Sequence, residues 1–141
     1  MPNAIFNSFK RDIANGSINL ATDAVKIMLV GSAYTPNIDT HTKRSDVTNE
    51  VSGTGYTAGG IALVNKTVTM NTTSDKGVFD ADDLTISNAT ITARGAVLYK
   101  ARGGASSADE LIAYLDFGAD ITSTAGNFNI AFDTNGIITI G

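Results

Sequence analysis

The fold class is decided by Ile91–Gly118, which reads ITARGAVLYKARGGASSADELIAYLDFG. Its two ends, Ile91–Tyr99 and Leu111–Gly118, are apolar runs rich in β-branched and aromatic residues, a composition typical of strands. Between them, Lys100–Asp109 contains glycine, serine and alanine without apolar periodicity, which indicates a loop. Short strands separated by turns of this kind favour an antiparallel sheet over alternating strands and long helices.

The same pattern of short apolar runs and turns continues on both sides of this stretch. Ala24–Ser32 (AVKIMLVGS) is almost continuously apolar, which predicts a strand buried on both faces. Ile61–Met70 predicts one or two strands with a bend at Asn65. Asn127–Asp133 alternates apolar and polar residues, as a strand with one buried face does.

The clearest local signal is the turn Asp133-Thr134-Asn135-Gly136. Asn-Gly tolerates positive φ, so this turn predicts a hairpin that joins Asn127–Asp133 to Ile137–Ile140. The chain as a whole is therefore expected to be mostly β. We predict an antiparallel β-sandwich or barrel with one short N-terminal α-helix and a long irregular excursion.

The predicted helix spans Asn3–Asn15, with Asn3 as its cap and Asn15-Gly16 as its stop signal. Four apolar residues recur on one face at helical spacing: Ile5, Phe6, Phe9 and Ile13. This stripe fits a helix packed on a sheet. The alternative is an N-terminal arm that docks on a partner.

Residues 33–60 interrupt the pattern with polar and turn-forming residues and weak apolar periodicity. So long an irregular segment in a small domain is usually functional or ordered by a partner, so we predict an extended loop or arm here. The 141 residues suffice for one domain. We assign that domain to residues 1–141, with strand 24–32 and residues 61–141 as the antiparallel core.

Composition excludes several classes of function. The net charge is −4, which argues against nucleic-acid binding because a phosphate backbone requires clustered Lys and Arg. The chain has no cysteine, so disulfides, thiolate catalysis and zinc–cysteine sites are ruled out. Its start lacks the pattern of a signal peptide, and no apolar run reaches the roughly 18 residues of a membrane span, so no membrane association is expected.

Three features resemble chemical sites, and each has a simpler interpretation. His41 is the only histidine and lies in the polar excursion, where a hydrogen-bonding surface role is expected rather than catalysis. Asp80–Asp83 lacks the glycine and glutamate of a calcium loop, which favours a turn with carboxylates bound to backbone N–H groups. Gly53–Gly60 (GTGYTAGG) lacks the spacing of a phosphate loop and is better explained by a tight, extended crossing. We therefore predict no catalytic residue, no cofactor and no metal ligand.

Several segments resemble a family of small structural proteins of tailed-phage virions. The resemblance rests on the N-terminal Asn3–Gly16 and on six further stretches: Val25–Pro36, Asp39–Gly60, Val78–Asp83, Ile91–Tyr99, Leu111–Gly118 and Phe128–Phe132 with Asn135-Gly136. The most specific part is the run DTHTKRSDVTNEVSGTGYTAGG. Gly95 departs from the pattern, and so small a residue would leave a hole or admit a neighbouring backbone.

The resemblance implies a non-enzymatic role in the virion, first as a capsid decoration or cement protein that binds the major capsid protein and bridges capsomers. A tail or baseplate component is the alternative within the particle, and a receptor- or glycan-recognition module is another. The resemblance also fits a homo-oligomer on the particle. The predicted contact residues are the following: Phe6, Phe9, Tyr34, Ile38, Val47, Val51 and Tyr56. The alternative for each of them is that it closes the domain's own core.

Overall fold

The computed structural model describes residues 2–141 and is mostly β, with 46% of the chain in strands and 10% in helical conformation. The predicted fold class is therefore confirmed. The strands are β1 Pro2–Ile5, β2 Val25–Val30, β3 Ile61–Ala62, β4 Thr67–Asn71, β5 Lys76–Asp80, β6 Leu84–Lys100, β7 Leu111–Ile130 and β8 Ile138–Ile140. The helical elements are α1 Asn7–Ala14 and two single 3₁₀ turns, η1 Arg44–Asp46 and η2 Ser106–Ala108.

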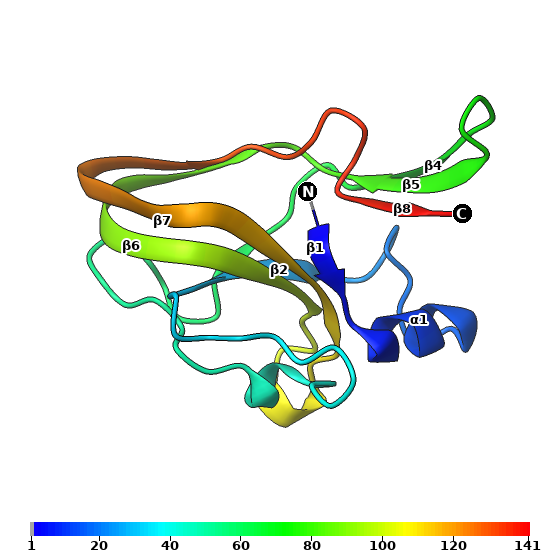
Figure 1. The fold of residues 1–141 in the computed structure, drawn as a ribbon, viewed down its shortest axis with the longest axis horizontal. Helices are drawn as coiled ribbons and strands as arrows, with labels where there is room; N and C mark the ends of the chain where they lie inside the picture. The colour runs from blue at the N-terminus through cyan, green and yellow to red at the C-terminus, as the bar shows by residue number, and fades with distance from the viewer. Residues whose placement is uncertain (1) are drawn as a thin grey trace.

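The strands form two antiparallel sheets, a five-stranded sheet in the order β1-β7-β6-β2-β3 and a three-stranded sheet in the order β4-β5-β8. The long hairpin β6–β7 dominates the molecule (Figure 1). It curls so that its far half lies in the same layer as the small sheet, and this gives the molecule its sandwich-like form.

Irregularities in the β6–β7 ladder accompany this curl. The register shifts between Ile86 and Ala89 and again between Ala89 and Ile91. Asn88 and Ala125, which lie at these shifts, both have positive φ, and Gly118 has positive φ at a further shift. Bulges increase the bend and twist of a strand pair, so these residues allow one hairpin to serve both layers.

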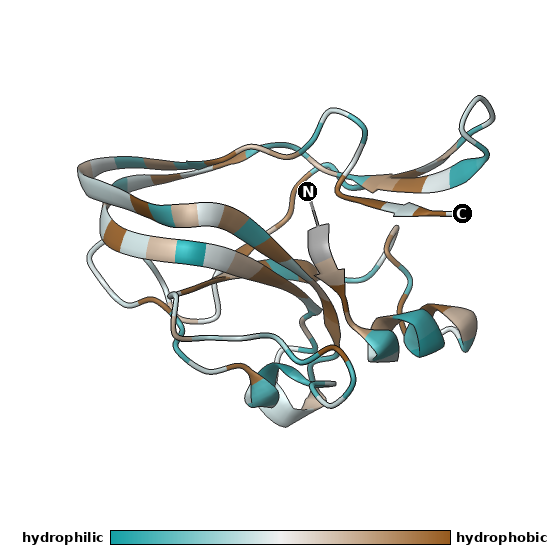
Figure 2. Cartoon of the chain, in the orientation of Figure 1, coloured by the Kyte–Doolittle hydropathy of each residue, from teal (hydrophilic) through white to brown (hydrophobic). Residues whose placement is uncertain are grey.

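Both faces of β2 are buried, as its continuous apolar sequence predicted. Ile27 and Leu29 belong to the main core, which also receives Phe79 from the small sheet. Met28 and Val30 point to the opposite face, where they join a second apolar cluster. Figure 2 shows apolar residues concentrated on the strands.

The N-terminal helix is shorter than predicted. Pro2–Ile5 forms a strand that pairs with β7, and α1 begins at Asn7 with Phe6 in extended conformation at its N-cap position. The prediction that Asn3 starts the helix is therefore wrong, because long-range pairing with β7 overrides the local helical spacing. The predicted end is confirmed: Asn15 is the C-cap, and Gly16 has φ of +83°.

The C-terminal hairpin prediction is also wrong. The turn itself forms, with the Gly136 N–H donating to the Asp133 carbonyl at 3.0 Å. However, β8 pairs with β5 of the small sheet, whereas β7 pairs with β6 and β1. The turn thus carries the chain from one sheet to the other, because Phe79 and Ile138 are buried together in this arrangement.

Candidate functional site on the 33–60 excursion

The excursion, residues 33–60, lies against the large sheet instead of extending away from it. Three isolated bridges hold it in place: Val30↔Glu50, Lys43↔Glu110 and Thr54↔Thr90. Figure 1 shows the segment looping beside β2 and below the β6–β7 hairpin. The predicted long irregular loop is therefore present, but these contacts show that it does not extend from the domain as an arm.

The glycine-rich run at the end of the excursion is a tight crossing, as its sequence predicted. A Cβ added at Gly53 would overlap the carbonyl oxygen of Thr90 on β6. One added at Gly60, where φ is +83°, would overlap the carbonyl oxygen of Ile27 on β2. Only residues without a side chain allow the backbone to pass so close to both strands.

Tyr56 fixes the middle of this crossing. Its hydroxyl donates to Oε2 of Glu50 at 2.7 Å and accepts the N–H of Leu29 at 3.0 Å. The same Glu50 oxygen accepts the N–H of Gly59 at 2.7 Å. Burial and the hydrogen bond to Glu50 raise the pKa of Tyr56, so its hydroxyl keeps the proton that it donates.

An ionic cluster holds the first half of the excursion to the loop before β7. Arg44 Nε donates to Oδ2 of the buried Asp109 at 2.8 Å, and the Arg44 guanidinium lies 5.0 Å from the centroid of the Tyr99 ring. Arg102 donates to both carboxylate oxygens of the buried Glu110, at 2.6 and 2.7 Å. The hydrogen bond from Arg102 lowers the pKa of Glu110. The Arg44–Asp109 ion pair therefore joins the excursion to this loop. The Arg102–Glu110 pair lies within the loop, and Glu110 meets Lys43 of the excursion through a backbone bridge.

His41 has a structural role in the turn at 37–41. Its Nδ1 accepts the N–H of Asn37 at 3.2 Å and lies 3.0 Å from the hydroxyl of Tyr34, over whose ring it stacks at 5.7 Å. The Asn37 side chain in turn accepts the N–H groups of Asp39 and Thr40. The imidazole therefore orders a turn at the surface of the excursion.

The seven predicted contact residues divide into buried and accessible side chains. Four of them are buried in the chain's own core, which is the alternative expected for them in place of a contact role: Phe6, Phe9, Tyr34 and Val51. Val47 and Tyr56 are partly buried against the same clusters. Ile38 alone among the seven is exposed, at 38%. Sequence periodicity identified apolar residues correctly but could not tell which ones face the domain's own sheet.

A groove of about 550 Å³ lies between the excursion and the curled hairpin. Its floor contains Val51 and Ile91, and its walls are mostly hydroxyl- and amide-bearing residues. Among these, the hydroxyls of Thr92 and Thr122 lie 2.9 Å apart across the β6–β7 ladder. Such a lining offers hydrogen bonds to a polyol or to an extended peptide. The sequence did not reveal it, because its residues come from segments that are far apart along the chain.

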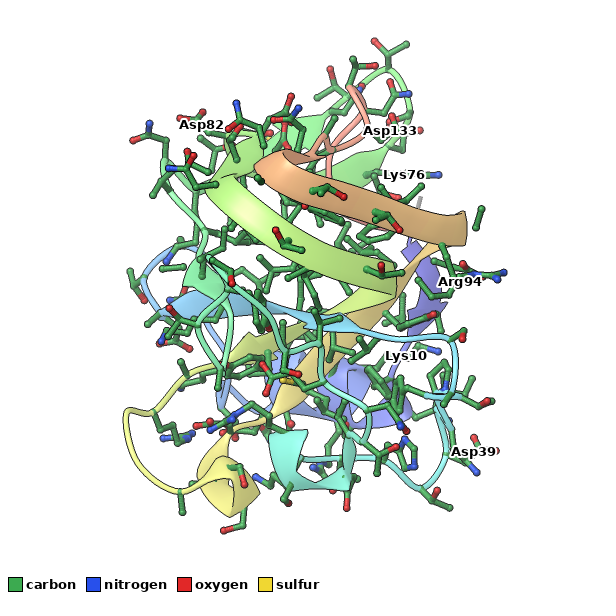
Figure 3. All side chains as sticks on the ribbon, turned by 90° about the vertical axis from the view of Figure 1, so that its left-hand side faces the viewer. Lys10, Asp39, Lys76, Asp82, Arg94 and Asp133 are labelled. Atoms are coloured by element: carbon green, nitrogen blue, oxygen red, sulfur yellow. The ribbon has the colours of Figure 1, made fainter. Side chains whose placement is uncertain are left out.

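The acidic segment 80–83 uses its carboxylates as hydrogen-bond acceptors. Asp80 accepts the N–H of Ala81, and Asp83 accepts the N–H of Phe132, so the predicted bonds from carboxylates to backbone N–H groups are confirmed. The predicted turn is not formed, because 81–83 is a short irregular link between β5 and β6. Asp82 accepts the side-chain amide of Asn65. Asp82 and Asp133 point outward at the top of Figure 3. Within residues 2–141, no three His, Asp or Glu side chains converge on one point as metal ligands do.

The surroundings of Gly95 leave no space for a larger residue at that position. A Cβ there would lie 2.6 Å from both the Leu115 carbonyl oxygen and the Tyr114 hydroxyl. Gly95 therefore admits a neighbouring backbone, one of the two outcomes expected from its sequence.

None of the helices in the described part of the chain is long and apolar enough to cross a membrane. Comparisons of the chain with protein-family models, with curated proteins and with solved structures gave no match.

Proposed function

We propose that this protein is a non-enzymatic structural component of a tailed-phage virion, most simply a decoration or cement protein on the outside of the head. In that role it binds the major capsid protein and stabilises contacts between capsomers. The sequence resemblance suggests this class of function. The observation that carries the proposal is the excursion, which is held against the rest of the domain by the Arg44–Asp109 ion pair and by close backbone crossings.

A preorganised surface suits a protein that acts by contact. A decoration protein stabilises a shell because it binds the assembled lattice more tightly than the free subunits. If its binding loops are already ordered, association loses less conformational entropy. The Arg44–Asp109 ion pair and the Tyr56 hydrogen bonds provide that order in the excursion.

The burial of four predicted anchors moves the proposed contact to the turn at 37–41. Ile38 is exposed there. Its backbone carbonyl accepts the N–H of Asn7, and Asp39 accepts the Asn7 side-chain amide at 2.6 Å. The turn is therefore tied to the start of α1 and presents an apolar side chain among polar groups, the arrangement of an interface anchor.

The test is to locate and count the protein on purified particles by cryo-electron microscopy and quantitative proteomics. Many copies over the head, lost on Ile38→Asp, would support the proposal. Ile121→Asp is the matched control, because Ile121 has similar exposure, 43%, and lies outside the excursion. Absence from the particle, or binding unaffected by Ile38→Asp, would refute this assignment.

A second candidate is glycan or receptor recognition at the tail or baseplate, which the hydroxyl-lined groove favours. Carbohydrate hydroxyls pair well with such a lining. A few copies at the tail tip would support this candidate instead of decoration. Binding to a glycan array that is reduced by Thr92→Val and Thr122→Val would support it independently.

A further inference from the structure

The small sheet has an open edge at β4. β4 pairs with β5 on one side only, because the strand order is β4-β5-β8. All five of its residues, Thr67–Asn71, are exposed. An edge strand of this kind presents unpaired N–H and C=O groups that another strand can engage.

A row of apolar side chains leads from the core to this edge. On the core-facing side of the sheet, Val68 lies opposite Phe79, which in turn lies opposite Ile138. Phe79 and Ile138 are buried, whereas Val68 is 52% exposed. In the next row, Met70 and Ile140 flank Gly77 and are 82% and 46% exposed. The apolar face of the small sheet thus continues past the part that the core covers.

β4 also lacks the usual protection of an edge strand. Natural edges carry lysine, proline or a bulge, or are very short, because these features prevent pairing with other chains. β4 has no charged residue, no proline and no register shift. The edges of the large sheet differ: β1 contains Pro2 and a register shift, and β3 is only two residues long.

We propose that β4 pairs antiparallel with β4 of a second copy of this chain, about a two-fold axis at Thr69. In that register Val68 faces Met70 of the other copy on the apolar side of the sheet. Thr67 faces Asn71 and Thr69 faces Thr69 on the polar side. Every cross-strand pair therefore matches in character, which is the self-complementarity that a two-fold interface requires.

The charges near β4 do not oppose pairing with a second copy. Lys66 is the charged residue just before the strand, and Asp75 and Lys76 follow it. In the proposed register the two Lys66 residues lie at opposite ends of the seam, roughly 20 Å apart at the strand rise of about 3.3 Å per residue. That separation exceeds the Debye length of about 8 Å at physiological ionic strength, so their repulsion is screened. Each Lys66 lies opposite the other copy's turn at 72–75, and its amino group donates to the Asp23 carbonyl of its own chain.

The test uses the absence of native cysteine. A residue on the two-fold axis meets its own copy at a Cα–Cα distance of about 4.5–5.5 Å, which a disulfide can span. We therefore expect Thr69→Cys to form a covalent dimer under mild oxidation. Val68→Cys alone should not, whereas a mixture of Val68→Cys and Met70→Cys should. Ser107→Cys, exposed on the loop before β7, is the control for random collision.

Sedimentation equilibrium of the cysteine-free chain measures the association itself. We expect a monomer–dimer equilibrium that Met70→Lys weakens by ~10-fold or more, because the substitution places a charge in the apolar seam. A monomer at all concentrations would overturn the proposal. So would a dimer that Met70→Lys leaves unchanged, or one in which Thr69→Cys crosslinks no better than Ser107→Cys. The inference does not depend on the proposed virion role, so particle-binding results leave it unaffected.

Discussion

At the residue scale, the glycines of the excursion act through the space that they leave open. Gly60 in the excursion and Gly103 in the loop before β7 have nearly the same φ, +83° and +82°. Their surroundings differ, because a Cβ at Gly60 would overlap the Ile27 carbonyl, whereas one at Gly103 would meet nothing within 4 Å. Alanine substitutions at the two positions therefore distinguish the free-energy cost of backbone strain, which both share, from that of a steric overlap, which only Gly60 has.

We expect Gly60→Ala to destabilise the protein clearly more than Gly103→Ala. The strain of positive φ costs about 1–2 kcal/mol in both variants. Gly60→Ala adds an overlap with β2, which typically costs a further ~1–3 kcal/mol. Urea unfolding followed by circular dichroism measures both losses. Equal losses of unfolding free energy in the two variants would show that the close crossing at Gly60 does not contribute to stability.

At the element scale, local patterns predicted some elements well. The apolar run of β2, the positive φ at Asn65 between β3 and β4, and the crossing at Gly53–Gly60 all follow from side-chain size or backbone preference. These features depend on a residue and its immediate neighbours. Sequence reasoning could therefore identify them without knowledge of the rest of the fold.

Elements defined by distant partners were predicted poorly. Asn135-Gly136 specifies a chain reversal, but nothing in the local sequence states that β8 pairs with β5 and not with β7. Likewise, Ile5 and Phe6 fit a helical face, yet their position is fixed by contacts with β7 and with residues of the second cluster. The burial of the predicted contact residues could not be predicted for the same reason. Whether Tyr34 and Val51 are buried depends on where the excursion folds back onto the domain.

The Tyr56 hydroxyl provides a test of how the excursion is held as an element. Tyr56→Phe removes the donor to Glu50 and the acceptor for the Leu29 N–H, while the ring is retained. We expect a loss of about 1–3 kcal/mol, because Leu29 N–H is then left without its partner. Hydrogen exchange should become faster at residues 50–60 and stay unchanged in α1, which serves as the internal control. Uniform acceleration across the chain would indicate global destabilisation instead of local release.

At the scale of the whole molecule, acid stability depends on carboxylates that are bound in the folded state. Hydrogen bonds from Arg102 lower the pKa of Glu110, and backbone N–H groups of Thr42 and Lys43 lower the pKa of Asp46. A carboxyl group whose pKa is lowered by folding stabilises the folded state above its unfolded pKa. That contribution disappears as the pH falls through the folded pKa.

We therefore expect the free energy of unfolding to fall as the pH drops below about 4.5, where carboxylates of the unfolded chain begin to take up protons. Arg102→Gln should make the protein less stable at pH 7, and the difference from the unmodified chain should shrink at pH 3. The reason is that Glu110 loses its charged partner and titrates nearer its ordinary range. Urea unfolding at both pH values checks this, and a difference that grows on acidification would contradict it.

The pairing of β1 with β7 has a consequence for how the chain reaches this structure. Ile5 lies beside Ala113, so two neighbours in the large sheet are separated by more than 100 residues of sequence. The contacts between β1 and β7 therefore raise the contact order of the protein. The chain loses the entropy of closing this long loop before the contacts between the two strands stabilise it. Folding is therefore expected to be slow compared with that of a helical domain of the same size. During synthesis, β1 leaves the ribosome before β7 and cannot pair with it until more than 100 further residues have followed.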